Sequence, residues 1–366
     1  MLPSLSIRSH QGLRPAAINH SNFVIAHLNV RSLYPKLDMV NQLITVNAID
    51  ILCVNETWLS PDISDSLIAI PGFKIFRRDR DTAGGGVLLY VREHIDATAR
   101  QDLSNNGITE TCWVEIKLPK RPSFLLCSAY RPPSANVEYY EALLDSLSCA
   151  FAEEKEVILL GDLNFNYKLD ETLSKNPVHY IEQLYGMKQL ITDPTRVTLT
   201  TSTTIDVILT SMSNNHVRSG VNKVTLSDHY MIFTELNFPK ILKEHKILRF
   251  RDFKNFNEND FITDLRDSST IQSVYNIDDL ENAWATWKNE VLRIFNKHAP
   301  ITERRLRDRR NPWVNDDIVK LTYKRDFLHE AATDATDNKD TNLWSLYKIT
   351  RNRVTTVIRN AKQNYF

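Results

Sequence analysis

The sequence has few cysteines and no long hydrophobic run, and its first residues do not resemble a secretory leader. Each of these features narrows the classes of protein that we expect. Apolar stretches such as Val-Ile-Leu-Leu at 157–160 are far too short to span a bilayer. The N-terminal residues contain no continuous apolar segment, which argues against secretion. The cysteines show no paired metal-ligand spacing, which favours a reducing compartment and buried, unreactive thiols at Cys53, Cys112, Cys127 and Cys149.

Net charge is also absent, because 45 Lys and Arg balance 45 Asp and Glu. The balance is uneven along the chain, however. Residues 241–366 hold 23 basic and 19 acidic side chains, which leaves 22 basic and 26 acidic side chains for residues 1–240. A mildly acidic first part suits a site that gathers carboxylates, whereas a basic remainder suits a polyanionic partner.

Short apolar runs separated by turn signals fill the chain from about Asn22 to about residue 238. Several of them are apolar almost throughout, which is typical of strands covered on both faces. Helical periods lie between some of these runs. The pattern therefore predicts sheets packed on each other and flanked by helices. The predicted strands are 23–30, 49–57, 86–93, 111–118, 123–130, 156–163, 204–211 and 230–237.

The composition changes after about Pro239, where long, charged, helically periodic segments begin. We therefore expect three regions: a flexible tail at 1–21, an α/β domain at 22–238 and a helical, basic region at 239–366. The helical region contains an arginine cluster at 304–310. This cluster is explained equally well by a solvated linker and by contacts to nucleic-acid phosphates.

Polar side chains stand at the ends of most of the predicted strands. On a rigid sheet such positions commonly gather into a site. Taken singly, each is explained as well by a turn or a cap, because Asp and Asn favour turns. The residues are Asn29, Glu56, Tyr130, Asp162, Asn164, Asp206, Ser227, Asp228 and His229.

Asp206 is the hardest of these to explain as a turn residue, because it interrupts an apolar strand. A carboxylate buried there without a partner costs several kcal/mol. We expect His229 to be that partner. Ser227, although it stands beside His229 in the sequence, is not expected to be a nucleophile, because no glycine elbow surrounds it.

Residues of these types can hydrolyse a phosphoester with a metal ion and without a covalent intermediate, provided that they converge. A carboxylate with an amide and water suits Mg²⁺, which polarises a phosphoryl oxygen. A second carboxylate can align or deprotonate the attacking water. A histidine that a buried aspartate keeps charged can bind a phosphate oxygen on which negative charge builds up.

The order of these motifs resembles the endonuclease/exonuclease/phosphatase superfamily over roughly residues 22–238. The motifs themselves are most similar to those of the apurinic-like endonuclease domains of non-LTR retrotransposons of the jockey and CR-one groups. They are Leu-Asn-Val-Arg, Asn-Glu-Thr, Ala-Tyr-Arg-Pro, Gly-Asp-Leu-Asn and Ser-Asp-His. The resemblance implies a four-layered α/β sandwich of the deoxyribonuclease I-like type, two packed mixed β-sheets flanked by helices, followed by an α-helical extension. It also implies that 239–366 is a linker that would precede a reverse transcriptase, whose Tyr-x-Asp-Asp motif this sequence lacks.

The resemblance further implies a metal site with Glu56 as the principal Mg²⁺ ligand and Mn²⁺ as a substitute. Asn29 would support the metal and the catalytic aspartate, and Asp228 would lie near the metal. Many apurinic endonucleases carry Asn-x-Asp at the first motif, whereas this chain has Arg31 at the Asp position. One ligand is therefore missing, and we expect weaker metal binding and less efficient cleavage at abasic sites.

The remaining roles concern the attacking water and the phosphate. By resemblance, Asp162 would position and activate the water, and Asn164 would help to orient both water and phosphate. Tyr130 and His229 would contact the scissile phosphate, and Asp206 would hold His229.

Two further residues belong to the predicted substrate-binding set. Thr198 aligns with a threonine of the retrotransposon endonucleases, and Ser227 would stabilise its loop. No small organic cofactor and no membrane partner are expected.

The resulting prediction is an Mg²⁺-dependent endonuclease that nicks double-stranded DNA, so that the free 3′ hydroxyl primes reverse transcription at the target site. Element RNA would be a second partner, through the basic helical extension. The protein would be translated in the cytoplasm and act on chromosomal DNA in the nucleus. Two alternatives stay open: a phosphatase or phosphodiesterase of the same fold acting on inositol phosphates or phospholipid head groups, and a catalytically silent nucleic-acid-binding relic.

Overall fold

The computed structural model describes residues 22–80, 84–104, 107–168, 176–198, 200–238, 247–305, 313–334 and 341–365. The tail predicted for residues 1–21 and most of the arginine cluster lie outside these described residues. The chain divides into two compact units, which are described separately below. The first consists of Met1–Ile241 together with Arg310–Phe366, and the second of Leu242–Arg309. The predicted boundary near residue 238 is thus followed by a second one near 310.

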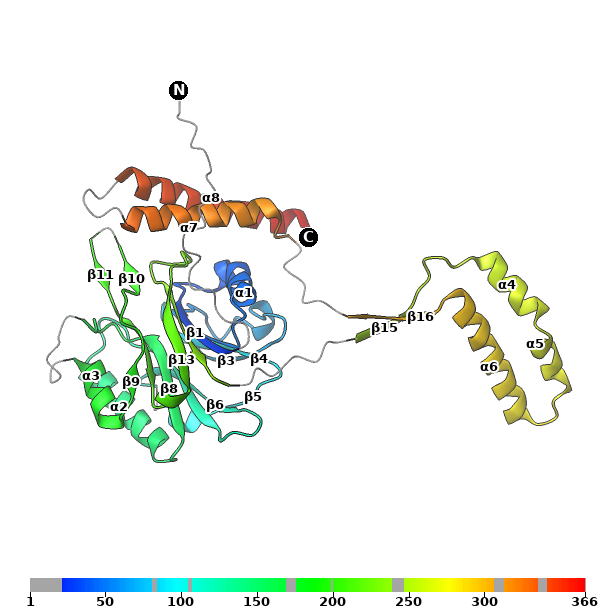
Figure 1. Cartoon of the computed structure of the whole chain (residues 1–366), viewed down its shortest axis with the longest axis horizontal. Coiled ribbons are helices and arrows are strands. Elements are labelled where there is room, and N and C mark those ends of the chain that lie inside the picture. The colour runs from blue at the N-terminus through cyan, green and yellow to red at the C-terminus, as the bar shows by residue number, and fades with distance from the viewer. Residues whose placement is uncertain are drawn as a thin grey trace, which may run out of the picture. The chain divides into compact units, whose positions relative to one another are not determined.

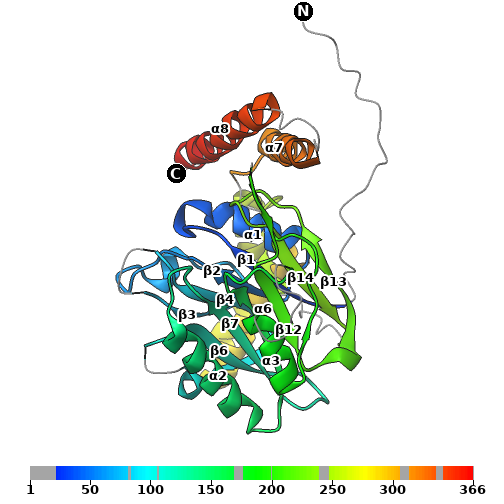
Figure 2. The ribbon, with the colours of Figure 1, turned by 90° about the vertical axis from the view of Figure 1, so that its left-hand side faces the viewer.

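Two six-stranded sheets form the centre of the first unit (Figures 1 and 2). Each sheet has one parallel pair of strands, β1 with β2 in the first and β7 with β8 in the second, and its other pairs are antiparallel. In sheet order, the first contains β13 (His216–Asn222), β14 (Met231–Leu236), β1 (Phe23–Asn29), β2 (Ile51–Asn55), β4 (Val87–Arg92) and β3 (Phe73–Arg78). The second contains β5 (Asp96–Ala99), β6 (Glu110–Lys117), β7 (Phe124–Tyr130), β8 (Glu156–Asp162), β12 (Asp206–Thr210) and β9 (Lys188–Gln189).

Helices cover the outer faces of the two sheets, so that the unit has four layers. One apolar cluster lies between the sheets and contains residues of both, such as Ile25 and Leu126. A second joins the outer face of the first sheet to α1 (Leu37–Val46). A third joins the outer face of the second sheet to α2 (Val137–Phe151) and α3 (Pro177–Tyr185). Strands buried on both faces must be apolar throughout, which is the pattern that the sequence carries. The predicted four-layered sandwich is confirmed.

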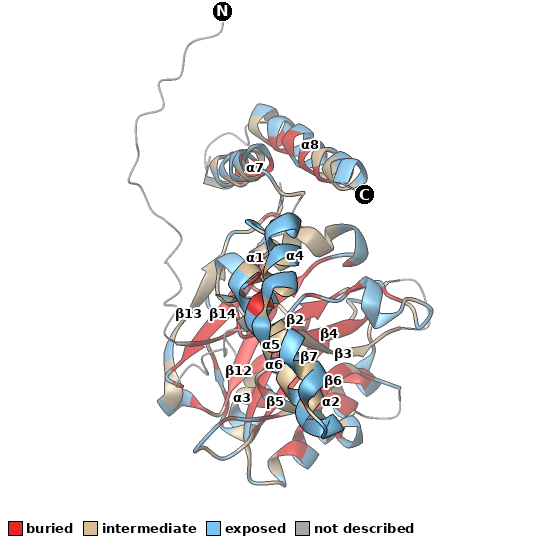
Figure 3. Ribbon diagram, turned by 90° about the vertical axis from the view of Figure 1, so that its right-hand side faces the viewer, coloured by how far each residue is buried: buried red, intermediate tan, exposed pale blue. Residues whose placement is uncertain are grey.

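A helical hairpin of α7 (Asp316–Asp334) and α8 (Thr341–Tyr365) belongs to the same unit. Its helices lie side by side, and the buried positions of α8 recur every three or four residues, on one face (Figure 3). Ile318 of α7, Val354 and Ile358 of α8 and Met39 of α1 share one apolar cluster. The hairpin thus packs on the helix that covers the first sheet.

The described residues of the second unit form three α-helices, a short 3-10 helix (Val274–Asn276) and a two-stranded antiparallel ribbon that the sequence did not predict. The aromatic rings of Phe261 and Phe295 meet with their centroids 4.8 Å apart between two of the helices. The ribbon escaped prediction because its strands are short, charged and more than forty residues apart, so no local apolar alternation marks them. The elements are β15 (Ile247–Arg251), α4 (Glu258–Asp267), α5 (Ser269–Ser273), α6 (Leu280–His298) and β16 (Ile301–Arg305).

Several other details differ from the sequence-based expectation. Asp206 begins its strand instead of interrupting it. Cys149 is exposed on α2, whereas the other three cysteines are buried. A short hairpin of β10 (Arg196–Val197) and β11 (Ser202–Thr203) was not foreseen. Among the described residues, no helix has the length and apolarity needed to cross a membrane.

Candidate active site

The two parallel strand pairs bring the predicted polar residues together. Asn29 at the end of β1 is in register with Asn55 at the end of β2, and Glu56 follows directly. In the other sheet, Tyr130 at the end of β7 is in register with Asp162 at the end of β8. Parallel strands end at the same edge of a sheet, so four segments distant in sequence supply one site.

Asn29 joins the two sheets at this edge. Its Nδ2 donates to Oε1 of Glu56 at 2.8 Å and to Oδ2 of Asp162 at 2.9 Å. Asn29 and Asp162 are buried, and the Glu56 side chain is 14% exposed. One amide therefore holds two carboxylates close together, one closed off from solvent and one partly open.

Asp162 is fixed through its backbone as well as its side chain. Its N–H donates to Oδ1 of Asn55 at 2.9 Å, and its Oδ1 accepts from the N–H of Asn164 at 3.0 Å. The preceding residue, Gly161, lies against Ala129 of β7 so closely that a Cβ would stand 1.8 Å from the Ala129 carbonyl oxygen. Glycine at 161 thus permits the close pairing of β8 with β7 immediately before Asp162.

His229 and Asp206 form the expected pair. Nδ1 of His229 lies 2.9 Å from Oδ2 of Asp206, and its Nε2 lies 3.8 Å from Oδ2 of Asp162. Asp206 stands opposite Asp162 in the antiparallel β12–β8 register. Sequence reasoning missed a second histidine, His27, whose Nε2 lies 3.1 Å from Oδ1 of Asp206. His27 reads as an ordinary member of an apolar strand, and no local signal marks its partner 179 residues away.

Charge and burial set the ionisation of this group. Burial and the nearby Asp206 raise the pKa of Asp162 above its ordinary value. Although it is also buried, Asp206 has a lowered pKa, because His229 and His27 stabilise its charged form. Burial opposes a charge on His229, but Asp206, Asp162 and Asp228 outweigh it and raise the pKa of His229 to about 9. The arrangement favours a charged His229 and makes Asp162 a stronger base than an ordinary aspartate.

Three other predicted residues lie around this centre. Burial and the carboxylates of Glu56 and Asp162 raise the pKa of Tyr130, which keeps its hydroxyl protonated. Asn164 adopts a φ of +53°, and its Nδ2 donates to the carbonyl oxygen of Arg131 at 2.8 Å. Ser227 donates to the carbonyl oxygen of Asn29 at 2.5 Å and accepts from the N–H of His229 at 3.1 Å. Ser227 therefore joins its loop to the end of β1, which is a positioning contact.

Thr198 makes its described side-chain contacts within its own turn, with Thr201 and Thr200. No described contact joins it to the centre. Thr195, three residues earlier, has that connection: its buried Oγ1 accepts from the N–H of Asp206 at 3.1 Å. Its carbonyl also accepts from the N–H of Tyr230 at 2.7 Å. Two threonines in one short segment are alike in sequence, and their different roles become apparent in the folded loop.

Asp228, which the resemblance placed near the metal, has its carboxylate oxygens paired with two arginines. Nη1 of Arg31 lies 3.1 and 3.2 Å from its two oxygens, and Nε of Arg196 lies 2.8 Å from Oδ2. Nε of Arg31 also lies 3.8 Å from Oε2 of Glu56. Arg196 was not among the predicted residues; it stands on β10, bridged to His229.

The donor set fits a divalent cation with hard oxygen ligands. Glu56 and Asp162 present carboxylate oxygens to the same amide, and Glu56 is partly accessible, as suits an ion that keeps several waters. A second grouping, Asp162, Asp206 and His229, places one ligand atom of each residue within 4.8 Å of the others. In that grouping, however, His229 and Asp206 already satisfy each other. The Glu56 carboxylate, which Asn29 holds and which is partly open to solvent, therefore fits a metal ion better.

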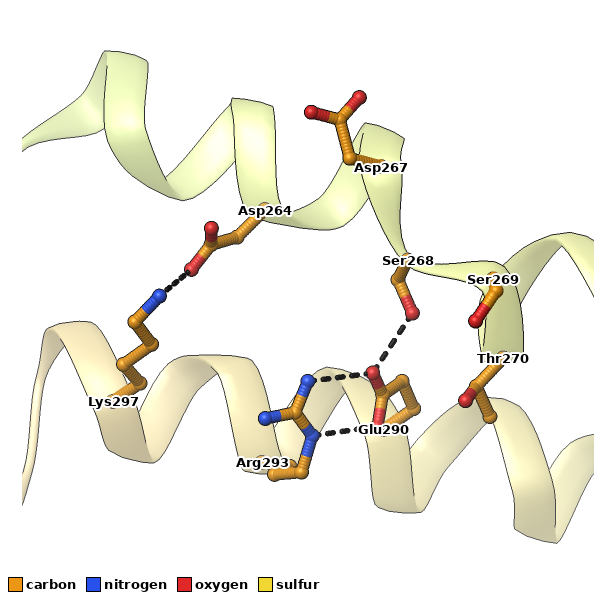
Figure 4. Close-up of a pocket in the computed structure, with 8 residues that line it drawn as sticks. All are labelled: Asp264, Asp267, Ser268, Ser269, Thr270, Glu290, Arg293 and Lys297. Atoms are coloured by element: carbon orange, nitrogen blue, oxygen red, sulfur yellow. Dashed lines mark hydrogen bonds and ion pairs between the residues drawn. The ribbon is translucent and has the colours of Figure 1, made fainter.

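The second unit has a surface groove between α4–α5 and α6 (Figure 4). Two of its acidic groups are paired within the groove: Glu290 with Arg293 at 2.8 Å, and Asp264 with Lys297 at 2.6 Å. Ser268 also donates to Glu290 at 2.8 Å. These paired charges, whose basic partners are exposed, form a polar helix–helix contact instead of a reactive centre.

Comparison with known proteins agrees with the geometry. Residues 26–229 match the family described as Endonuclease/Exonuclease/phosphatase family, and residues 314–366 match the Female sterile protein K10 C-terminal domain. The first match spans more than half of the chain and contains every residue of the predicted site. No curated protein sequence matches the chain.

Three of the solved structures similar to this chain are 16–17% identical to it in sequence. The endonuclease domain of TRAS1, a telomere-specific non-LTR retrotransposon, has 16% identity and a TM-score of 0.48, covering 60% of this chain and 100% of that domain. A 3′–5′ exonuclease from Neisseria meningitidis has 17% identity and a TM-score of 0.49, covering 59% of this chain and all of its own. The catalytic domain of Xenopus laevis APE2 has 16% identity and a TM-score of 0.47, covering 61% and 94%.

Proposed function

Because the chain belongs to the endonuclease/exonuclease/phosphatase family, we propose that it is a divalent-metal-dependent endonuclease that hydrolyses a phosphodiester bond of double-stranded DNA. The observation that carries the proposal is the junction at Asn29, which holds Glu56 and Asp162 from two sheets beside the charged His229. This set supplies separate groups for the metal, for the water and for the phosphate.

Each group has a task that follows from its surroundings. Asp162, with its raised pKa, accepts a proton from the attacking water, and Asn164 orients that water. His229, kept charged by Asp206, donates from Nε2 to a phosphate oxygen as negative charge builds up there. The hydroxyl of Tyr130, which its raised pKa keeps protonated, donates a hydrogen bond to the same phosphate group. Glu56, supported by Asn29, would hold Mg²⁺ or Mn²⁺, whose chemistry is to polarise the phosphoryl oxygen.

The biological role that we propose is target-site nicking for a non-LTR retrotransposon, in the nucleus, where the released 3′ hydroxyl primes reverse transcription. The motifs around Asn29, Glu56, Tyr130 and Asp162 support this role. Residues 239–366 would then be the helical region that leads toward a reverse transcriptase, with element RNA as a second partner.

Nicking of supercoiled plasmid DNA in Mg²⁺ tests the activity. We expect the purified chain to convert plasmid to the open circle and Asp162→Asn to slow this by about 10²–10⁴-fold, the usual contribution of a general base. Asp145→Asn, an exposed aspartate on α2, is the matched control and should nick at the wild-type rate.

The outcomes separate the alternatives. Equal nicking by the wild type and Asp162→Asn would attribute the activity to a contaminant and refute the proposal. Phosphate release from soluble inositol polyphosphates without nicking would establish the phosphatase alternative. Salt-sensitive DNA binding without either reaction would establish the catalytically silent one.

A further inference from the structure

Arg31, Asp228 and Arg196 form a chain of charges at the rim of the site. Asp228 accepts from Arg31 through both oxygens and from Arg196 through one. The exposed fractions of the three side chains are 48% for Arg31, 24% for Asp228 and 35% for Arg196. One carboxylate thus holds two guanidinium groups beside each other at the solvent boundary.

The backbone that carries Arg31 is held firmly. Arg31 and Ser32 have φ values of +46° and +79°, which cost energy in residues other than glycine. The N–H of Ser32 donates to the carbonyl oxygen of Glu56 at 2.8 Å, and Nζ of Lys36 donates to that of Arg31 at 3.0 Å. The guanidinium therefore projects from a fixed support next to Glu56.

Both arginines keep donors for a ligand. The Nη2 group of Arg31 and both terminal nitrogens of Arg196 make no hydrogen bond with the residues that the structure describes. Guanidinium groups bind phosphate through paired N–H donors, and holding them in place beforehand lowers the entropy lost on binding. Arg196 is also paired with His229 through a backbone β-bridge, so the arginine pair lies next to the proposed phosphate-binding histidine in the fold.

Arg31 has a second consequence, for the cation. Its Nε lies 3.8 Å from Oε2 of Glu56, so a divalent ion bound to Glu56 would stand close to a fixed positive charge. Both carboxylate oxygens of Asp228 accept hydrogen bonds from the arginines, so Asp228 neutralises arginine charge instead of binding the metal.

We infer that Arg31 and Arg196, positioned by Asp228, are a binding site for a backbone phosphate of the nucleic acid, and that Arg31 weakens the affinity of the neighbouring Glu56 for a divalent cation. The inference rests on the proposed function for its substrate class. Arg31 and Arg196 are binding residues, and Asp228 is a positioning residue that does not ligate the metal. Arg31 therefore strengthens the binding of DNA and weakens the binding of the metal ion.

Two binding measurements on the full chain test this without catalysis. Binding of duplex DNA is followed by fluorescence anisotropy in EDTA over a range of salt concentrations, and Mn²⁺ binding is followed by electron paramagnetic resonance of the free ion. We expect Arg31→Ala to bind DNA about 10-fold more weakly and to reduce the slope of log affinity against log salt by about 1, the value for one phosphate contact. The same variant should bind Mn²⁺ about 3- to 10-fold more tightly, because a repelling charge is gone.

Two further variants sharpen the result. Asp228→Asn should weaken DNA binding but leave Mn²⁺ affinity within about twofold, whereas loss of a metal ligand would weaken it by about 10-fold or more. Arg121→Ala is the matched control: Arg121 packs on Phe238, ahead of the start of β7, at the end of that strand opposite the site. It should change neither measurement.

Unchanged or weaker Mn²⁺ binding by Arg31→Ala, or unchanged DNA binding, would overturn the inference. So would a large loss of Mn²⁺ affinity in Asp228→Asn. Absence of nicking by a wild-type protein whose variants shift both affinities as stated would refute the proposed activity and leave the inference standing.

Discussion

His229 in the sandwich and His329 in the helical hairpin are almost equally buried, with 4% and 3% of their surfaces exposed. Their surroundings nevertheless favour different protonation states, the charged ring for His229 and the neutral ring for His329. His229 faces Asp206 and Asp162, which raise its pKa to about 9 against the effect of burial. Burial lowers the pKa of His329 to about 4, and the nearby charges of Arg325 and Lys223 act in the same direction.

The aromatic surroundings of His329 complete the contrast. Its ring meets those of Tyr230, Trp344 and Tyr347, with centroids 5.6, 5.4 and 4.7 Å away. Tyr230 follows His229 directly in the chain, so the hairpin packs against the loop that carries the site. The comparison teaches that burial alone does not mark a functional histidine. The partner charges decide whether the ring can bind an anion or serves as an apolar contact.

The largest expected effect comes from making the same change in both histidines. His229→Gln should slow plasmid nicking by about 10²–10³-fold, because the charged donor to the phosphate is lost. His329→Gln should leave nicking within about threefold, since that ring touches neither carboxylate. Initial rates at 25 °C, with circular dichroism to verify folding, check the pair. Similar losses in both variants would show that the hairpin contributes as much to catalysis as the strand-end site.

Removing the charge that holds His229 should have the next largest effect. Asp206→Asn should lower the pKa of His229 from about 9, because the neutral amide no longer stabilises the ring's positive charge. Histidine NMR titration of the metal-free protein measures this directly. The control is Asp264→Asn in the second unit, whose carboxylate lies 2.7 Å from Nε2 of His298 but is 32% exposed. That change should leave the His229 titration as it is in the wild type, and an unchanged titration in Asp206→Asn would contradict the assigned pairing.

The smallest effect is expected on stability in acid. His329 has a lowered pKa in the folded protein, so the unfolded chain takes up a proton first as pH falls below about 6.5. The contribution of His329 to the free energy of unfolding is therefore fully present above that pH and is lost as pH falls through about 4. At pH 5 the loss amounts to ~1–2 kcal/mol. His229 acts in the other direction: its contribution is complete below about 6.5 and is lost as pH rises through about 9.

Thermal unfolding at pH 7 and at pH 5 measures the acid effect. The wild type should lose a few degrees more than His329→Gln between the two pH values. An equal loss in both proteins would mean that His329 takes up its proton in the folded state.

The sequence predicted the sandwich and most of the candidate site for a common physical reason. Strands buried on both faces are apolar, so a polar residue at the end of such a run stands out, as Asp162 and Glu56 do. The carboxyl ends of β1, β2, β7 and β8 then meet because the pairs are parallel. Asp206 was found by the cost of burying a carboxylate, which required a partner such as His229.

What the sequence could not predict depends on contacts between distant segments. His27 contacts Asp206, which is 179 residues away in the sequence. Arg196 contacts Asp228 from a hairpin whose strands are only two residues long. Arg31 was noticed as a departure from a motif, but its partners are set by the backbone at 30–33, where φ turns positive. Such geometry is a property of the folded loops and leaves no periodic trace in the chain.

A substitution of Gly161 would disrupt the site without changing any of its polar residues. Any replacement adds a Cβ that meets the carbonyl oxygen of Ala129 at 1.8 Å, so β8 must move away from β7. Asp162, the next residue, would move with it and lose its reach to Asn29, although no polar residue had changed. Intact polar side chains at the site are therefore insufficient to identify an active variant of this sequence, and residue 161 must be checked together with them.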